Sequence, residues 1–280
     1  MGLRFTILAS GSTGNSMLVA ARDAKVLVDV GLSVRKIEGL LAEVGVSPEE
    51  LDAVLITHEH VDHVRGAGAF ARKYRLPVYA NEKTWRQLER QFGGLDPAQR
   101  RVFVTGSELW FGSLRVESFE LSHDAAEPVG FSFAAAGYKL GLATDLGYVS
   151  RNVMEAIRDS DVLIIESNHD VEMLRAGRYP WNVKRRILGD KGHLSNEAAG
   201  EALCELLSPR TKRVYLAHLS RDHNLADLAR LTVNNILEER GVYRRCSVRL
   251  MDTYFDRPTP WDDLTMTPIG GEIADELVRR

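Results

Sequence analysis

The chain has 280 residues, a net charge of −3 and an apolar fraction of 44%, which are values of an ordinary globular protein with a sizeable core. No stretch approaches the roughly 20 apolar residues of a membrane span, and the apolar run near the N-terminus is shorter than a signal-peptide core. The 36 basic and 39 acidic residues exclude a wholly basic nucleic-acid-binding chain. Cys204 and Cys246 do not suggest a disulfide framework, so we expect a reducing, cytoplasmic setting.

Apolar runs bounded by turn residues predict the elements of the first half of the chain. In order, they are strands 3–9, 17–20 and 25–30, helix 33–44, strand 53–57, helix 61–74, strand 77–80 and helix 82–92. The same signals predict the second half, in order strands 101–105, 114–121, 129–135 and 138–144, helix 150–158, strand 162–167, helix 195–207, strand 213–219, helix 225–239 and strand 247–251. A polar, basic stretch without a predicted element covers 169–194.

Strands followed by strands mixed with helices occur twice along the chain. This order predicts an α/β fold in which two packed sheets carry helices on their outer faces, a four-layer αββα sandwich. We expect this domain to cover residues 1–257 and a turn-rich C-terminal tail to cover 258–280.

The segment THEHVDH, residues 57–63, follows the buried strand 53–57 directly. Imidazole nitrogen and carboxylate oxygen are ligands that suit borderline divalent metals. On an extended backbone His58 and His60 point to the same side and can share one ion, while Asp62 and His63 can reach a second. A solvated polar loop is the alternative, and three histidines within six residues disfavour it.

Three further candidates, His123, Asp145 and His218, each follow an apolar strand. Taken singly, each is equally well explained as a hydrogen-bonded side chain at a strand end. Together with residues 58–63 they complete two ligand sets, which are His58, His60 and His123 for one ion and Asp62, His63 and His218 for the other. Asp145 would bridge the two ions. Such a site keeps a position for water, as a catalytic rather than a structural metal site does.

The motif HxHxDH after an apolar strand, with a strand-end Asp before it and His, Asp and His after it, resembles the metallo-β-lactamase-fold hydrolases. Five segments further resemble the YycJ/WalJ group of bacterial cytoplasmic proteins associated with DNA exonuclease activity, and they are GSTGNS (11–16), ATDLGYVS (143–150), ESNHDVEML (166–174), GDKGHLSN (189–196) and AHLS (217–220). The resemblance implies an αββα fold, a dinuclear site with the ligands above, and phosphodiester hydrolysis with 5′–3′ polarity.

One departure and two absences qualify the resemblance. His223 stands in RDHN, after AHLS, where the group is expected to have an asparagine pair. The interval from Asp145 to His218 is too short for the extra domain of β-CASP relatives, so no such insertion is expected. Neither cysteine falls at a ligand position, which argues against the cysteine-bearing β-lactamases.

In the expected mechanism two divalent ions share a hydroxide that attacks phosphorus and also neutralise charge on the phosphoryl oxygens. Asp62 is the ligand on which we expect this catalysis to depend. His193, just before a predicted helix, is the candidate acid for the leaving oxygen or a phosphate contact, with a backbone-bonded helix-entry residue as the equal alternative. Asp29 and His169 lie at or just after the ends of strands and are candidates for orienting the ligands. For Asp29, an ordinary residue at a strand-to-turn boundary is an equal alternative.

The stretch from Arg175 to Lys191 is rich in basic residues, with Tyr179 and Trp181 interleaved. Basic groups can hold phosphates while aromatic faces stack on bases, although a solvated loop is an equal alternative. The loop GSTGNS could present backbone N–H groups to a phosphate, or be a plain hairpin turn. The candidate substrate contacts are therefore Ser12, Asn15, Tyr179, Lys184, Arg185, Arg186 and Ser195, the last of which is first of all a helix N-cap.

Three functions fit these features. The first is a metal-dependent nuclease, with a DNA exonuclease foremost. The second is a hydrolase of a small thioester, lactam or cyclic phosphodiester, and the third is a non-catalytic metal or nucleic-acid binding module. The complete ligand set disfavours the third, and the basic aromatic stretch favours the first over the second. Zn²⁺, Mn²⁺ and Fe²⁺ all suit the ligands, and nucleic acid, DNA above all, is the expected partner, without a membrane.

Overall fold

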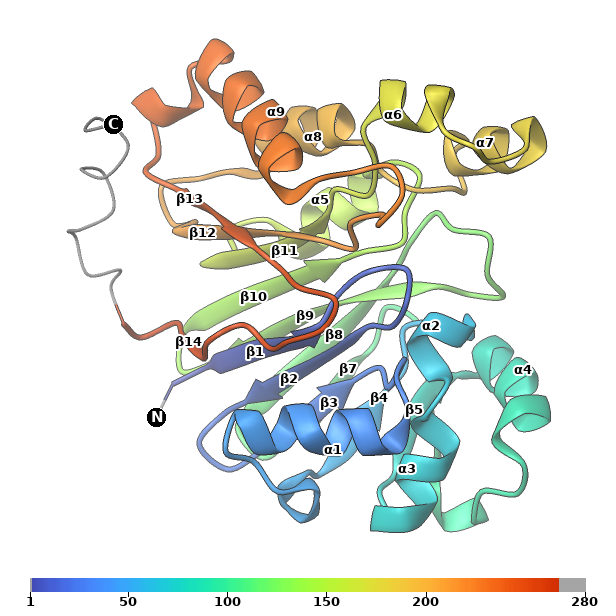
Figure 1. Ribbon diagram of the computed structural model, residues 1–280. Helices are drawn as coiled ribbons and strands as arrows, with labels where there is room; N and C mark the ends of the chain where they lie inside the picture. Colours follow the sequence, from blue (N-terminus) through green and yellow to red (C-terminus); the bar gives the residue numbers. More distant parts are fainter. Residues whose placement is uncertain (1, 267–280) are drawn as a thin grey trace.

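Two β-sheets pack face to face in the computed structural model, and helices cover both outer faces (Figure 1). The structure describes residues 2–266. Over this range the predicted four-layer αββα sandwich is confirmed. None of the helices in this range has the length and apolarity that crossing a bilayer requires.

Within residues 2–266 the first sheet contains seven strands, in the spatial order β14 (Asp262–Asp263), β1 (Arg4–Ala9), β2 (Ser16–Ala20), β3 (Lys25–Val28), β4 (Ala53–Leu55), β5 (Val78–Asn81) and β6 (Arg100–Phe103). Pairing is antiparallel from β14 to β3 and parallel from β3 to β6. The helices of this half are α1 (Val34–Glu43), α2 (Val61–Val64), α3 (Ala67–Tyr74) and α4 (Glu82–Phe92), with short 3₁₀ turns at Pro48–Glu50 and Pro97–Gln99.

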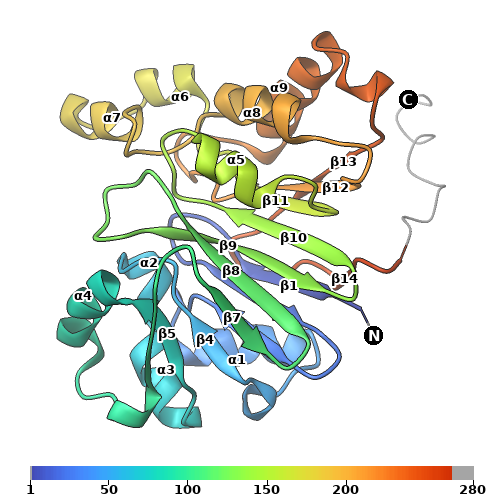
Figure 2. The same cartoon turned by 180° about the vertical axis from the view of Figure 1, so that it is seen from behind.

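In the described part of the chain the second sheet also contains seven strands, in the order β13 (Arg249–Asp252), β12 (Arg213–Ala217), β11 (Val162–Glu166), β10 (Tyr138–Ala143), β9 (Val129–Ala135), β8 (Leu114–Glu120) and β7 (Glu108–Phe111). Pairing is antiparallel from β7 to β10 and parallel from β10 to β13. Its helices are α5 (Arg151–Ile157), α6 (Val171–Ala176), α7 (Trp181–Ile187), α8 (Asn196–Leu206) and α9 (Ala226–Glu239), with a 3₁₀ turn at Val242–Arg244. Figure 2 shows α6 and α7 beyond one end of this sheet.

The core follows from the alternation of side chains along the strands. In β1, Ile7 faces the second sheet, while the next residue, Leu8, packs with α1 on the outer face. Phe131 and Phe133 of β9 fill the layer between the sheets from the other side. Burial of this apolar surface, at about 25 cal/mol per Å², is the main force that holds the four layers together.

The structure corrects the predicted elements at three places. The helix expected at 61–74 is interrupted at Gly66, where a Cβ atom would lie 2.2 Å from the carbonyl oxygen of Leu32. The stretch 169–194, for which no element was predicted, contains α6 and α7, because many charged residues hide the apolar period of two short helices. Strand β7 was missed because it is a four-residue edge strand with alternating exposure.

The segment after residue 257 packs against the sandwich as far as the structure describes it. The N–H of Thr259 donates to the carbonyl of Ile7, and β14 pairs with β1. Asp262 of β14 contacts the other sheet, where it accepts a hydrogen bond from the hydroxyl of Tyr215 at 2.8 Å and forms an ion pair with Arg213 at 2.6 Å. The rest of the expected tail, 267–280, lies outside the described residues.

Candidate metal centre

Polar side chains gather where several strands of both sheets reach their carboxyl ends. The strands and the residues at or after their ends are β3 with Asp29, β4 with residues 58–63, β8 with His123, β10 with Asp145, β11 with Glu166 and β12 with His218. In α/β sheets the carboxyl ends of parallel strands are the usual place for a binding site. The scattered candidates from the sequence therefore come together at one edge of the sandwich.

The first predicted ligand set, His58, His60 and His123, is assembled. Each residue offers a ring nitrogen, and the three nitrogens lie within 4.8 Å of one another. Nε2 of His123 lies 3.3 Å from Nδ1 of His60. On the other side of its ring, Nδ1 of His123 lies 3.0 Å from the carbonyl oxygen of Gly192, which turns Nε2 toward the cluster.

The second predicted set, Asp62, His63 and His218, is also assembled within 4.8 Å. Oδ2 of Asp62 lies 3.6 Å from Nε2 of His63 and 3.5 Å from Nε2 of His218. Asp145 lies between the two sets, with one oxygen 3.2 Å from Nε2 of His63 and the other 3.8 Å from Nε2 of His123. This is the place that a bridging carboxylate requires.

Three buried polar atoms of the cluster show that it suits a cation. Among the described residues, His58 Nε2, His218 Nε2 and Asp145 Oδ2 are buried without a hydrogen-bond partner. An unsatisfied buried polar atom costs about 1–3 kcal/mol, and divalent cations would satisfy these atoms. Nitrogen and oxygen donors at this spacing fit divalent metal binding.

Asp29 orients His63 from behind. Its Oδ2 lies 2.8 Å from Nδ1 of His63, so the opposite nitrogen, Nε2, faces Asp145 and Asp62. Thr57 fixes the carboxylate, because its N–H and its hydroxyl donate to the two oxygens of Asp29 at 2.9 and 2.8 Å. A carboxylate behind a histidine is the usual means of setting which ring nitrogen faces a metal.

Glu166 performs the same task for His218 and His193, and the sequence analysis did not single it out. Its Oε1 lies 2.7 Å from Nδ1 of His218 and 2.8 Å from Nδ1 of His193, and its Oε2 accepts the N–H groups of Leu146 and Leu194 at 3.0 Å each. The side chain is fully buried. The available signal was a carboxylate at the end of an apolar strand, the same signal that pointed to Asp29.

The charges of the cluster shift several protonation equilibria. Burial alone would lower the pKa of His63 and His218, but Asp145 and the other carboxylates outweigh it, so the pKa of His63 lies well above its ordinary value and that of His218 rises to about 10. For His58 the opposite holds, because burial and the neighbouring His63 outweigh Asp145 and keep its pKa well below the ordinary value. Without a cation, protons on His63 and His218 therefore balance the carboxylates.

The backbone is also specialised around the cluster. Asp29, Asp145 and His218 have φ values of +57°, +64° and +56°, in the left-handed region that non-glycine residues rarely adopt. Such strain persists only where the surroundings impose it, and it concentrates at functional sites. Gly31 allows the chain after β3 to press against the HxHxDH segment, because a Cβ atom there would lie 1.7 Å from the carbonyl oxygen of Asp62.

Comparison with known proteins shows the family of this chain. A family model described as a beta-lactamase superfamily domain matches residues 24–219. The chain is 48% identical over 259 residues to the exodeoxyribonuclease YycJ of Bacillus anthracis, which covers 92% of this chain and 98% of the relative. It belongs to the metallo-β-lactamase superfamily, in the YycJ/WalJ group.

Two further matches extend this result. The exodeoxyribonuclease WalJ of Streptococcus pneumoniae is 45% identical over 266 residues, 94% of this chain and 99% of the relative. Among solved structures, the metallo-β-lactamase-fold protein YhfI from Bacillus subtilis has a TM-score of 0.69 over 92% of this chain and 99% of its own, at 17% identity, and so supports the fold alone. As a member of this group, the chain is a metal-dependent hydrolase.

The basic stretch contributes to two short helices, α6 and α7, which lie beyond the metal centre. We call these two helices the arm. Tyr179 donates its hydroxyl to Asp222 at 2.9 Å, and Arg185 is exposed. Arg186 pairs with Asp124, next to the ligand candidate His123, and so reaches the rim of the cluster. Three of the four predicted contacts in this stretch are therefore open to a substrate on at least part of their surface.

The fourth, Lys184, is turned inward. Its side chain is buried, and its Nζ donates to the carbonyl of Arg175 at 2.6 Å. This lysine holds α7 against α6, so we leave it out of the proposed substrate contacts. The arm is anchored further by His223, the departure from the group pattern, which is buried against the ring of Tyr179 and packs so tightly that a Cβ atom at Gly177 would lie 2.2 Å from its Nε2.

The other predicted contacts lie in different surroundings. Ser12 is exposed at the tip of the loop between β1 and β2, whereas the amide of Asn15 lies 3.1 Å from Nε2 of His63 and so contacts the cluster itself. Ser195 caps α8 by accepting the N–H of Ala198. His169 is buried, neither ring nitrogen has a partner among the described residues, and burial lowers its pKa to about 4. No hydrogen bond within residues 2–266 ties it to the cluster.

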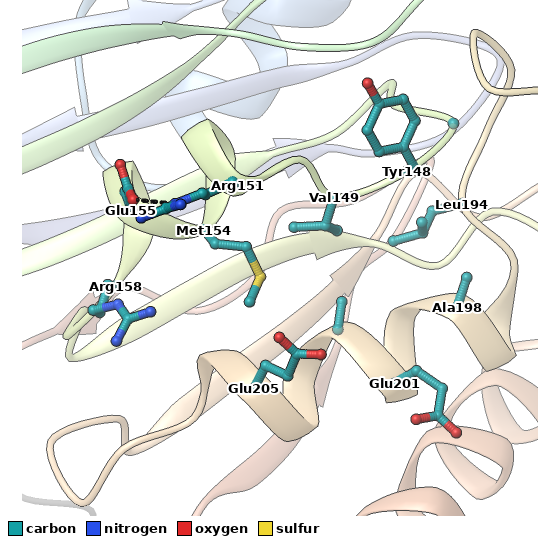
Figure 3. Close-up of a pocket in the computed structure, with 12 residues that line it drawn as sticks. Tyr148, Val149, Arg151, Met154, Glu155, Arg158, Leu194, Ala198, Glu201 and Glu205 are labelled. Carbon is teal, nitrogen blue, oxygen red and sulfur yellow. Dashed lines mark hydrogen bonds and ion pairs between the residues drawn. The ribbon is translucent and has the colours of Figure 1, made fainter.

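Two hollows that share Tyr148 in their lining lie beside the cluster. One, of about 380 Å³, opens beside His123 and is lined by Lys83, Tyr148 and Lys191 among others. Figure 3 shows the other, of about 570 Å³, between α5 and α8, where Tyr148 stands at the rim and Arg151 pairs with Glu155. None of the predicted metal ligands lines this second hollow.

Proposed function

We propose that the chain is a dinuclear metal-dependent phosphodiesterase that degrades DNA as a 5′–3′ exonuclease, with Zn²⁺ or Mn²⁺ as its metal. The position of Asp145 between two complete ligand triads is the observation that carries the dinuclear proposal. DNA as the substrate is supported by two relatives of nearly full length that are named exodeoxyribonucleases. The polarity rests on the resemblance of the motif segments.

The proposed ligands are His58, His60 and His123 for one ion, Asp62, His63 and His218 for the other, and Asp145 for both. Bound divalent ions would supply positive charge that lowers the pKa of the attacking water and offsets charge on the phosphoryl oxygens. Asp29 and Glu166 would keep the imidazoles of His63 and His218 turned toward the ions.

His193 is proposed to protonate the leaving oxygen. Although burial lowers its pKa, the adjacent carboxylate of Glu166 raises it above the ordinary value, so the imidazole holds its proton more strongly than a free histidine does. Glu166 holds Nδ1, which leaves Nε2 as the donor for the substrate. A positioned acid of this kind contributes about 10²–10⁴ to the rate.

End-labelled single-stranded DNA, duplex DNA and RNA, each incubated with Mn²⁺ or Zn²⁺, test the proposal. We expect mononucleotides to be released from the 5′ end of DNA, and release to disappear in Asp62→Ala. His193→Ala should keep its metal content and slow release by about 10²–10⁴, and elemental analysis should find two ions per chain. As the matched control, Glu155→Gln changes an exposed carboxylate on α5 and should leave the rate unchanged.

Two outcomes would contradict the proposal. Release from the 3′ end alone would remove the assigned polarity. A protein that cleaves no nucleic acid, yet hydrolyses a simple thioester or a cyclic phosphodiester, would be the small-molecule hydrolase that the sequence also allows.

A further inference from the structure

A hollow of about 410 Å³ lies beside the metal centre, and the proposed mechanism leaves it unused. It is formed by Ser10, by residues 219–221 and 224–226 after β12, and by residues 253–257 after β13. Two of its apolar side chains are exposed to solvent, Phe255 to 42% and Leu225 to 62%. These loops lie at the end of the sandwich that carries α6 and α7 (Figure 1).

Ser10 connects this hollow directly to the ligand candidate His218. Its hydroxyl accepts the N–H of His218 at 2.8 Å, and its own N–H donates to the carbonyl of Tyr254 at 2.8 Å. Phe255 packs near Gly11, at the start of the loop whose Asn15 contacts the second ligand set. The hydrogen bonds of Ser10 therefore link the hollow to the cluster.

Two arginines place positive charge on the aromatic rings of the hollow. The guanidinium of Arg221 lies 4.3 Å from the centre of the Phe255 ring, and that of Arg257 lies 4.0 Å from the ring of Tyr254. Within residues 2–266 neither arginine has an ion pair with a carboxylate, whereas Arg213, for example, pairs with Asp262. A guanidinium held on a ring keeps its N–H edge free for a phosphate.

We propose that this hollow binds the unpaired DNA strand beyond the scissile phosphate. The exposed ring of Phe255 stacks on a base, and Arg221 and Arg257 hold backbone phosphates. Aromatic faces interleaved with basic groups are the usual means of holding a single strand without sequence preference. The inference rests on the proposed nuclease function and adds a strand-binding platform to it, which consists of Phe255, Arg221 and Arg257.

The platform also meets the arm. Asp222, next to Arg221, accepts the hydroxyl of Tyr179, so the loop after β12 touches both. Trp181, on α7 of the arm, is a further aromatic side chain that is 60% exposed. A strand that lies on Phe255 can thus continue toward α7.

The test compares a long and a minimal substrate. We expect Phe255→Ala and Phe255→Leu to raise the KM for a single strand of about 20 nucleotides roughly tenfold, because stacking requires the ring. Hydrolysis of thymidine 5′-(p-nitrophenyl phosphate), which is too short to reach the platform, should keep the kcat/KM of the wild type. The double variant Arg221→Ala with Arg257→Ala should bind an uncleavable phosphorothioate strand more weakly. The slope of log affinity against log salt concentration should be smaller by about 0.7 for each lost phosphate contact.

Matched controls lie at the opposite end of the strands. Trp110→Ala removes an exposed aromatic ring on β7, and Arg22→Ala removes an arginine in the turn between β2 and β3, and neither should change any of these values.

Unchanged KM, affinity and salt slope in the platform variants would overturn this inference while the proposed function stands. An equal loss on the minimal ester would also overturn it, because it would assign Phe255 a structural role. A wild-type protein that neither binds nor cleaves the strand would overturn both proposals.

Discussion

The buried carboxylate of Glu166 gives the sharpest test of how the site is built. Glu166→Gln keeps the shape of the side chain but removes the charge that holds the imidazoles of His193 and His218. In the folded, metal-free protein the pKa of Glu166 falls from an ordinary value of 4.5 to about 2, since those two histidines outweigh the cost of burial. At about 1.4 kcal/mol per pKa unit, the charged form contributes about 3 kcal/mol to folding.

The direction with pH follows from the lowered pKa. The contribution of Glu166 is fully present above its unfolded pKa of 4.5 and is lost as pH falls toward the folded value of about 2. Urea unfolding of metal-free wild type and Glu166→Gln should therefore differ by about 3 kcal/mol at neutral pH, and by clearly less near pH 3.

Glu155→Gln serves as the control, because Glu155 is an exposed carboxylate whose pair with Arg151 should contribute less than about 0.5 kcal/mol. A difference below about 1 kcal/mol for Glu166→Gln at neutral pH would refute the reasoning. So would a difference of full size that persists near pH 3, because it would come from packing rather than from charge.

The remaining predictions concern the protons and the packing of the site. Zn²⁺ added to the metal-free protein near pH 7.5 should release about two protons, those of His63 and His218, as measured by calorimetry in buffers of different ionisation enthalpy. The stability that His218 contributes to the metal-free protein should be complete below about pH 6.5 and be lost as pH rises toward about 10, which urea titrations across that range would check. Gly31→Ala should destabilise by more than about 2 kcal/mol and lower the metal content, because its Cβ atom would overlap the carbonyl of Asp62. Gly39→Ala, in open space on α1, should stabilise by about 1 kcal/mol in the same denaturation assay.

Much of the architecture was predictable from the sequence because the core strands are apolar runs bounded by turns. The run at 53–57 and the motif that follows it belong to one short segment, so their relation needed no tertiary knowledge. The elements that were missed lack this local signal. Helix α7 carries three consecutive basic residues, and Lys184 among them turns inward only because a carbonyl of α6 lies within its reach.

The residues of the site also divide into those that a local sequence pattern reveals and those that only the tertiary structure reveals. His58 to His63 are recognisable by spacing, and Asp145 and His218 by their place after apolar strands. Glu166 carries the same strand-end signal, but its importance depends on β11 lying beside β12, which places it against His218. The platform around Phe255 draws on loops after two different strands, and no pattern within a single segment could reveal it.

Strand β14 has a consequence for how the protein is made. Strand β1 lies between β2 and β14, and Asp262 joins β14 to Arg213 and Tyr215 in the opposite sheet. A nascent chain emerging from the ribosome therefore presents β1 with one unpaired edge until residues near 262 have been synthesised. An unpaired strand edge is a template for pairing with other chains. Chains truncated after residue 257 should expose this edge permanently and aggregate during expression.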